Sequence, residues 1–276
     1  MEKIRLDKLL VSRGLAPTIK KAQALILAKA VKVNDATQDK AGTLVPADAE
    51  IQIKGADNPY VSRGGLKLKG ALDEFAVNVE GLIALDVGAS TGGFTDCLLQ
   101  AGAKKVYAVD VNYGQLAWKL RQDKRVVVIE RTNIRLYDGA DLIEKPDLAT
   151  IDVSFISLKV VLPPILRLLK DDAQILALIK PQFEAAREEV GKNGVIQDPA
   201  IHDRVVAQIC EFCKSINLDV LQTCASSILG PAGNKEFFIL ARKKISTGMN
   251  LKASFGNKFS SKLRGIIPSA SRDCFQ

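Results

Sequence analysis

The sequence predicts an α/β fold in which a seven-stranded, doubly wound sheet follows a small N-terminal α+β domain. From Leu82 onward, strongly apolar runs alternate with amphipathic stretches of helical spacing. The runs lie at residues 83–87, 106–110, 126–130, 148–152, 175–180, 218–223 and 237–241. The stretches expected to form the crossover helices lie at about 95–101, 113–123, 157–170 and 199–217. Strands that are apolar on both faces and separated by helices are typical of a Rossmann-like parallel sheet covered by two helix layers.

The first 60 residues have a pattern of their own. Arg5–Arg13 is predicted to form a short helix that ends at Gly14, and Thr18 is expected to cap a second helix that runs through Ala30. Short strands are expected at residues 31–35, 42–46 and 51–54. A unit of this size is too small to house much chemistry, but it is suited to docking on a phosphate backbone.

The net charge of +8 is concentrated at the two ends of the chain. Residues 1–60 contain 10 Lys/Arg and 7 Asp/Glu, residues 61–245 contain 24 and 23, and residues 246–276 contain 5 and 1. Basic ends on a nearly neutral body fit a polyanion such as nucleic acid, although such an excess also serves solubility alone. We therefore expect an RNA-binding domain over 1–60, an enzymatic domain over 61–245 and a basic, flexible tail over 246–276. The candidate RNA ligands are Arg5, Lys8, Arg13, Lys20, Lys21, Lys29, Lys32 and Arg63.

The composition argues against several classes of protein. No window holds the roughly 18 apolar residues of a membrane span, and the first residues lack the apolar core of a signal peptide. The five cysteines do not have the spacing of a disulfide framework or of a metal site. We expect a cytoplasmic protein that binds neither a membrane nor a metal, and the sequence does not specify its oligomeric state.

A glycine-rich loop follows the first strand of the predicted sheet. The stretch Asp86–Phe94 (DVGASTGGF) opens a helix at the edge where such sheets bind ligands. Asp110 ends the next strand, where an acid can accept hydrogen bonds from ribose hydroxyls. The dinucleotide pattern GxGxxG is not met, and an acid at Asp86 suits a cationic cofactor better than a pyrophosphate. The loop therefore favours S-adenosylmethionine over an NAD-type cofactor, and a structural turn without a ligand stays open as an alternative.

Four charged residues are expected at the same edge of the sheet. Asp152 and Lys180 end the fourth and fifth apolar runs, and Glu236 begins the seventh, which reaches this edge if it is an antiparallel edge strand. Lys67 lies on the helix before the sheet. In this arrangement Lys180 is the candidate base for a hydroxyl nucleophile, and Asp152 and Glu236 would hold the two lysines in position. Lys67 would stabilise negative charge that develops on the oxygen.

The N-terminal segment resembles the alpha-L RNA-binding motif. The resemblance rests on Arg5–Leu10 (RLDKLL), Ala22–Ile26 (AQALI) and Val31–Asn34 (VKVN). Thr18 and Ile19 stand where Ser-Arg usually opens the second helix of that motif, and Lys29 stands where glycine is usual. The first departure removes one phosphate ligand, and Lys20 and Lys21 are the residues that could replace it.

The larger domain resembles the FtsJ-like ribose 2′-O-methyltransferases, which use a Lys–Asp–Lys–Glu tetrad. Taken with the N-terminal motif, three further stretches resemble the TlyA (hemolysin A) family: Ser62–Lys67 (SRGGLK), Asp86–Asp96 (DVGASTGGFTD) and Lys180–Glu184 (KPQFE). The resemblance implies S-adenosylmethionine-dependent methylation of a cytidine 2′-hydroxyl, with ribosomal RNA or ribosomal subunits as the partner. It implies a catalytic tetrad of Lys67, Asp152, Lys180 and Glu236. It implies a cofactor pocket that includes Asp86, Gly88, Ser90, Thr91, Gly92, Asp110 and Asn133.

Other functions stay open on sequence alone. A non-catalytic ribosome-binding factor could carry the same N-terminal module, and a pseudouridine synthase could use its Arg5–Asp7 tripeptide. An amino-group methyltransferase would carry two prolines after the fourth strand, which Asp152–Phe155 lacks. A membrane-active hemolysin would need a membrane span or a strongly basic amphipathic helix. Lys69, two residues from Lys67, is a competing candidate for the first position of the tetrad.

Overall fold

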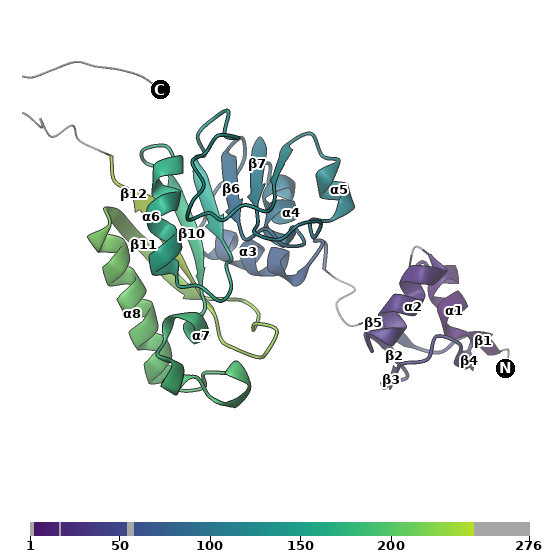
Figure 1. The fold of residues 1–276 in the computed structure, drawn as a ribbon. Helices are drawn as coiled ribbons and strands as arrows, with labels where there is room; N and C mark the ends of the chain where they lie inside the picture. Colours follow the sequence, from purple (N-terminus) through teal and green to yellow (C-terminus); the bar gives the residue numbers. More distant parts are fainter. Residues whose placement is uncertain (1–2, 17, 54–57, 246–276) are drawn as a thin grey trace, which may run out of the picture. The chain divides into compact units, whose positions relative to one another are not determined.

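The computed structural model describes residues 3–16, 18–53 and 58–245 (Figure 1). Its N-terminal part contains the helices α1 (Leu6–Ser12) and α2 (Ile19–Leu27). Its short strands are β1 (Lys3–Arg5), β2 (Val31–Val33), β3 (Ala36–Gln38), β4 (Leu44–Pro46) and β5 (Ile51–Ile53). β1 pairs antiparallel with β4, and β2 lies between β3 and β5 in a second antiparallel sheet. The predicted helices and strands are present, and β1 and β3 are additional strands.

A buried acid joins the two N-terminal helices. The Asp7 carboxylate of α1 accepts hydrogen bonds from Arg5 Nη2 (2.7 Å) and from Gln23 Nε2 of α2 (3.0 Å). The hydrogen bonds from Arg5 hold the pKa of this carboxyl well below its ordinary value. Asp7 is therefore a structural link between the helices, and a carboxylate so paired and buried does not fit the catalytic role that a pseudouridine synthase would require.

The helix α2 ends at Leu27, three residues before the predicted end at Ala30. Thr18 caps its beginning as predicted, since its hydroxyl accepts a hydrogen bond from Lys21 N (3.2 Å). The chain then turns through Lys29, whose φ of +56° lies in the left-handed region. Glycine is favoured at this position after a helix because a Cβ destabilises the left-handed conformation. Lys29 therefore closes α2 at a conformational cost.

The C-terminal part is built on one seven-stranded sheet. Its strands are β6 (Ile83–Val87), β7 (Lys105–Val109), β8 (Val126–Ile129), β9 (Leu148–Ile151), β10 (Gln174–Ile179), β11 (Leu218–Ala225) and β12 (Phe237–Lys243). They follow the order β11-β12-β10-β9-β6-β7-β8, in which β12 alone runs against the direction of the others. All seven predicted strands are present, and the predicted α/β fold is confirmed.

The last strand lies inside the sheet and not at its edge, where we expected it. β12 pairs with β10 on one side and with β11 on the other. Residues 226–236 join β11 to β12 as an antiparallel pair, so β11 takes the edge position. The antiparallel direction itself is as predicted, and it brings the start of β12 to the edge where β9 and β10 end.

Helices cover both faces of the sheet (Figure 1). On one face lie α6 (Leu158–Leu168) and α8 (Pro199–Ser215), and on the other lie α3 (Arg63–Glu74) and α4 (Gly93–Gln100). The remaining helical segments are α5 (Trp118–Arg121), α7 (Pro181–Glu184) and the 3₁₀ turns Arg187–Glu189 and Lys192–Gly194. Each face buries its own apolar cluster, as expected for strands that are apolar on both sides.

The stretch 113–123 forms less helix than predicted. Only α5 is helical, because the chain first passes through Gly114 at a φ of +75°. Glu130 Oε1 fixes this turn by accepting a hydrogen bond from Gly114 N (3.0 Å). The turn places Tyr113 and Trp118 at the surface, where they are largely exposed.

Some sequence predictions concern residues outside the described ranges. These are the tail over 246–276 and residues 54–57 near the end of the predicted RNA-binding domain. Within the described part of the chain, no helix combines the length and the apolar character that crossing a membrane requires. The same ranges contain no group of His, Cys, Asp and Glu side chains arranged to hold a metal ion.

Replacing Lys29 by glycine should stabilise the N-terminal part. Glycine relieves the left-handed strain but gains entropy in the unfolded chain, so we expect a net gain of about 0.5–1 kcal/mol. Hydrogen exchange of the α1 and α2 amides in the full-length chain measures this gain. Lys29→Ala is the matched control, because it removes the same charge and keeps the Cβ. Equal protection in the two variants would show that the backbone at Lys29 is not strained.

Candidate active site

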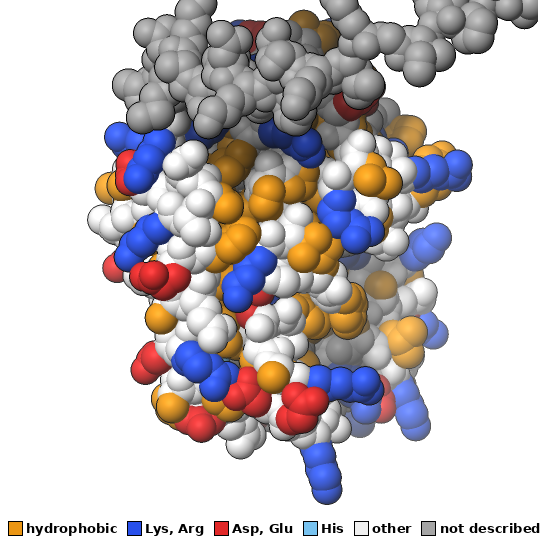
Figure 2. Space-filling model, turned by 60° about the vertical axis from the view of Figure 1, so that its left-hand side comes forward, with side chains coloured by type: hydrophobic (Ala, Val, Ile, Leu, Met, Phe, Trp, Pro, Cys, Tyr) orange, Lys and Arg blue, Asp and Glu red, His pale blue; other side chains and the backbone are white. Residues whose placement is uncertain are grey.

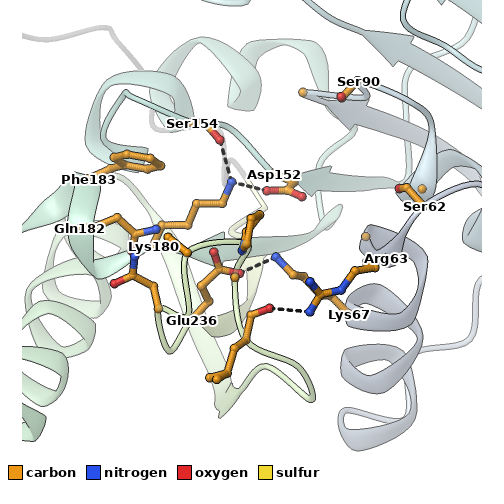
Figure 3. Close-up of a pocket in the computed structure, with 18 of the residues that line it drawn as sticks. Ser62, Arg63, Lys67, Ser90, Asp152, Ser154, Lys180, Gln182, Phe183 and Glu236 are labelled. Atoms are coloured by element: carbon orange, nitrogen blue, oxygen red, sulfur yellow. Dashed lines mark hydrogen bonds and ion pairs between the residues drawn. The ribbon is translucent and has the colours of Figure 1, made fainter. Parts of the chain in front are cut away.

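Two lysine–carboxylate pairs meet at the carboxyl edge of the sheet (Figure 3). Asp152 follows β9, Lys180 follows β10, Glu236 precedes β12, and Lys67 reaches them from α3. These residues converge because the parallel strands end at the edge where the antiparallel strand begins. The structure thus brings together the four residues predicted for the tetrad.

Lys180 is held by two acceptors from the turn after β9. Its Nζ lies 2.6 Å from Asp152 Oδ1 and donates a hydrogen bond to Ser154 Oγ at 2.9 Å. Only 10% of the Lys180 side chain is exposed. A lysine at such a depth requires a partner of opposite charge, which Asp152 supplies.

Lys67 forms the second pair. Its Nζ donates to Glu236 Oε2 at 2.5 Å, and both side chains are buried. Lys69 instead pairs with Asp73 one turn further along α3, and half of its side chain is exposed. Residues two apart on a helix do not share a face. The geometry therefore favours Lys67 over Lys69 for the tetrad.

The four charged side chains line a cavity of about 720 Å³. The glycine loop and the segment between β11 and β12 form other parts of its wall. Arg63 also lines it, and its Nη2 donates to the Leu229 carbonyl at 3.1 Å. Phe155 is 90% exposed, and its ring centroid lies 4.9 Å from that of Phe183, which also lines the cavity. The cavity combines paired charges with an aromatic wall, a combination that suits a substrate with polar groups and a flat ring.

The glycine loop packs tightly against the end of β9. Gly88 has a φ of +84°, and a Cβ there would lie 2.5 Å from the Asp152 carbonyl oxygen, so no larger residue fits. Gly92, also left-handed, is the N-cap residue of α4. Ser90 N donates to Asp110 Oδ2 at 2.7 Å, which ties the loop to the end of β7.

A second cavity, of about 460 Å³, adjoins the first. Both cavities are lined by Gly88, Ser90, Asp152, Ser154 and Phe155. The second is also lined by Asp110, Asn112 and Asn133, and by apolar residues that include Val109, Val111 and Ile134. Of the other predicted cofactor residues, Thr91 lines only the first cavity, and Gly92 lines neither.

Asp86 requires a correction. We expected its carboxylate to line the cofactor pocket, but it is completely buried and lines neither cavity. It accepts hydrogen bonds from Thr95 Oγ1 of α4 (2.6 Å) and from Thr150 Oγ1 of β9 (3.1 Å). Burial raises the pKa of this carboxyl to about 7. The carboxyl therefore supports the glycine loop from beneath.

Sequence reasoning missed residues that shape the cavity wall. Asn234 is buried, and its side chain accepts from Ile196 N (3.0 Å) and donates to the Gly194 carbonyl (2.8 Å). It thereby joins two loops that line the cavity. The turn-forming stretch Gly230–Asn234 (GPAGN) was an available signal. Ser154 carried no such signal, because a serine in a loop is common.

The predicted RNA ligands of the N-terminal part fall into two groups. The first group lies at the surface, exposed or half-buried: Lys8, Lys20, Lys21, Lys29 and Lys32. The second is engaged within the fold, since Arg5 pairs with Asp7 and Arg13 donates to the carbonyls of Ala47 and Ala49. Figure 2 shows one face of the protein, on which Lys and Arg side chains are scattered among acidic and hydrophobic ones.

Comparison with known proteins agrees with this architecture. Residues 60–243 match the FtsJ-like methyltransferase family, and residues 4–51 match the S4 domain. The fold and these matches define the class of the protein, a methyltransferase preceded by an S4 domain.

Similar proteins narrow this class. The chain is 51% identical over 239 residues to YqxC of Bacillus subtilis, and this alignment covers 86% of this chain and 85% of YqxC. It is 41% identical over 249 residues to the 16S/23S rRNA (cytidine-2′-O)-methyltransferase TlyA of Mycobacterium tuberculosis, with 90% and 93% covered. A solved structure from Streptococcus thermophilus is 44% identical in sequence and has a TM-score of 0.70. The match covers 88% of this chain and 90% of the chain in that structure. The chain belongs to the TlyA (hemolysin A) family of FtsJ-like methyltransferases.

The Asp86 carboxyl should make stability depend on pH. Its pKa is about 7 in the folded protein and about 3.9 in an unfolded chain. Its contribution to stability is therefore fully present below about pH 4 and is lost as the pH rises through about 7. We therefore compare the free energy of unfolding of Asp86→Asn with that of the wild type. As the pH rises from about 4 to about 7, this difference should change by about 4 kcal/mol in favour of Asp86→Asn. Urea denaturation at several pH values measures this difference, and a constant difference would contradict the raised pKa.

Proposed function

We propose that this protein methylates the 2′-hydroxyl of a cytidine in ribosomal RNA, with S-adenosylmethionine as the methyl donor. The observation that carries the proposal is the pair of buried ion pairs, Lys180–Asp152 and Lys67–Glu236, in one cavity. Membership of the TlyA family supports the same activity, because the relative from Mycobacterium tuberculosis is named for it.

The paired lysines can act on a hydroxyl group. In its neutral form, Lys180 would accept the proton of the 2′-hydroxyl, and Asp152 would stabilise the resulting ammonium group. The Lys67 ammonium group, held by Glu236, would stabilise the negative charge that develops on the oxygen. Most of the acceleration is expected to come from holding the hydroxyl in line with the methyl group.

The second cavity fits the nucleoside of the cofactor. Each Asp110 oxygen already accepts one backbone N–H, from Ser90 or from Asn112, and each retains a lone pair for a ribose hydroxyl. Asn133 and the apolar side chains of this cavity suit an adenine ring. When bound, S-adenosylmethionine supplies a methyl group on a positively charged sulfur, which a hydroxyl oxygen can attack.

The N-terminal part would hold the RNA. Its surface lysines can contact phosphates, and Arg63 lines the catalytic cavity, where a phosphate of the target nucleotide would pass. Arg13 contributes to RNA binding mainly by keeping the fold, because its guanidinium group is bound to backbone carbonyls. Affinity should therefore depend most on the lysines at the surface.

Methylation of ribosomal subunits tests the proposal. Unmodified subunits are incubated with the protein and tritiated S-adenosylmethionine, and ribose methylation is mapped as resistance to alkaline cleavage. We expect one labelled cytidine, and we expect Lys180→Ala or Lys67→Ala to lower the rate by about 10²–10⁴-fold. Lys69→Ala is the matched control on the same helix and should keep the wild-type rate.

Two results would reject parts of this proposal. If the wild-type protein binds the subunits but transfers no label, it is a non-catalytic RNA-binding factor. If label is transferred, and Lys69→Ala is inactive while Lys67→Ala keeps the wild-type rate, the tetrad is assigned to the wrong lysine.

Phe155 should stack on the target base. Its exposed ring beside Phe183 offers a flat surface at the cavity, and stacking on an aromatic ring contributes about 1–3 kcal/mol per base. We expect Phe155→Ala to raise the KM for RNA by about tenfold and Phe155→Trp to restore it. Because Phe155 lines both cavities, isothermal titration with S-adenosylmethionine measures any loss of cofactor affinity separately. An unchanged KM for RNA in Phe155→Ala would exclude the stacking role.

A further inference from the structure

The Lys180 amine has two fixed partners, and both lie on the same turn. Asp152 Oδ1 is 2.6 Å from Nζ, and Ser154 Oγ accepts a hydrogen bond from Nζ at 2.9 Å. Figure 3 shows Lys180 reaching across to this turn, with its Nζ between the two side chains. The tetrad interpretation uses Asp152 and leaves Ser154 without a role.

The two partners hold the amine in different ways. Ser154 Oγ accepts a hydrogen bond from Nζ, whereas Asp152 Oδ1 lies at ion-pair distance and has no hydrogen-bond partner among the described residues. Besides its bond to Cε, a tetrahedral Nζ has three positions, and Ser154 occupies one of them. Lys180, Asp152 and Ser154 all line the catalytic cavity, so the amine is held where a substrate can reach it.

An ion pair with Asp152 alone would leave the amine free to turn about the Cε–Nζ bond. The hydrogen bond to the Ser154 hydroxyl restrains this rotation.

The backbone is shaped to present Ser154 in this way. Phe155 has a φ of +62°, a left-handed conformation that a bulky residue seldom adopts. The turn keeps the Ser154 hydroxyl on Lys180, while the Phe155 ring stays largely exposed. Such strain persists where the surrounding structure requires one particular geometry.

We propose that Ser154 is a positioning residue that holds the Lys180 amine in place to accept the proton of the substrate hydroxyl. This inference rests on the proposed function. In the reaction, a bond forms between the hydroxyl oxygen and the methyl carbon as the carbon–sulfur bond breaks, and its electron pair stays on sulfur. The hydroxyl proton moves onto the lone pair of neutral Lys180, and the ammonium group that results is held by the charge of Asp152 and by the hydrogen bond to Ser154.

Kinetics of Ser154→Ala and Ser154→Thr test this role. We expect Ser154→Ala to lower kcat by about tenfold and to change the KM values for RNA and for S-adenosylmethionine much less. Ser154→Thr keeps the hydroxyl and should restore most of kcat.

The pH profile of kcat adds a second kinetic readout. Ser154→Ala removes the hydroxyl that accepts a hydrogen bond from the Lys180 ammonium group. The acid limb of the profile should therefore move to lower pH in this variant. The other charged groups at this cavity, Asp152, Lys67 and Glu236, are the same in all three proteins, so the shift would report the lost acceptor.

A measurement without cofactor or RNA separates positioning from a general loss of activity. Nitrogen-15 relaxation of the Lys180 ammonium group reports its rotation about the Cε–Nζ bond. We expect slow rotation in the wild type and in Ser154→Thr, and rotation at least several times faster in Ser154→Ala. Thermal denaturation of each variant establishes that it is folded.

The outcomes are distinguishable from a failure of the proposed function. If the wild type methylates RNA and Ser154→Ala keeps its kcat, or rotates no faster at Lys180, the positioning role is overturned. If the wild type transfers no methyl group, the proposed function fails, and fast rotation in Ser154→Ala alone would then describe only a structural hydrogen bond.

Discussion

The structure of this site depends on holding two lysine side chains inside a protein cavity, each beside a carboxylate. A buried ion that loses its partner costs about 3–5 kcal/mol, so Lys67 and Lys180 require Glu236 and Asp152 close by. Both partners lie far from these lysines in sequence, because the sheet edge is where separate strands meet. The direction of β12 follows from this requirement, since a parallel β12 would carry Glu236 to the opposite edge.

A second constraint acts beneath the glycine loop. Gly88 lies against the Asp152 backbone, so the loop and the turn that carries Asp152 and Ser154 are packed as one unit. Asp86 holds this unit from below through Thr95 and Thr150. A change in the loop would therefore shift the turn that carries the two partners of Lys180, although the loop and Lys180 lie far apart in sequence. The two cavities share residues for the same reason.

The N-terminal part separates residues that build the fold from residues that are free at the surface. Arg5 and Arg13 have the charge of RNA ligands, but Asp7 and two backbone carbonyls occupy their guanidinium groups. Arginine suits this work because its planar fork matches paired oxygen acceptors. The surface lysines remain available to phosphates. Basic composition alone does not distinguish these two uses.

The sequence by itself determined the seven strands, the glycine loop and the four charges, because strand periodicity and residue type are local properties. It also indicated Asp110 at the end of a strand, next to the loop. Only the tertiary structure decided that Lys67 and not Lys69 faces the cavity, that β12 lies inside the sheet, and that Asp86 is buried below its loop. It alone brought Ser154 to Lys180. These outcomes depend on which face of an element is covered, and packing between segments distant in the chain decides that.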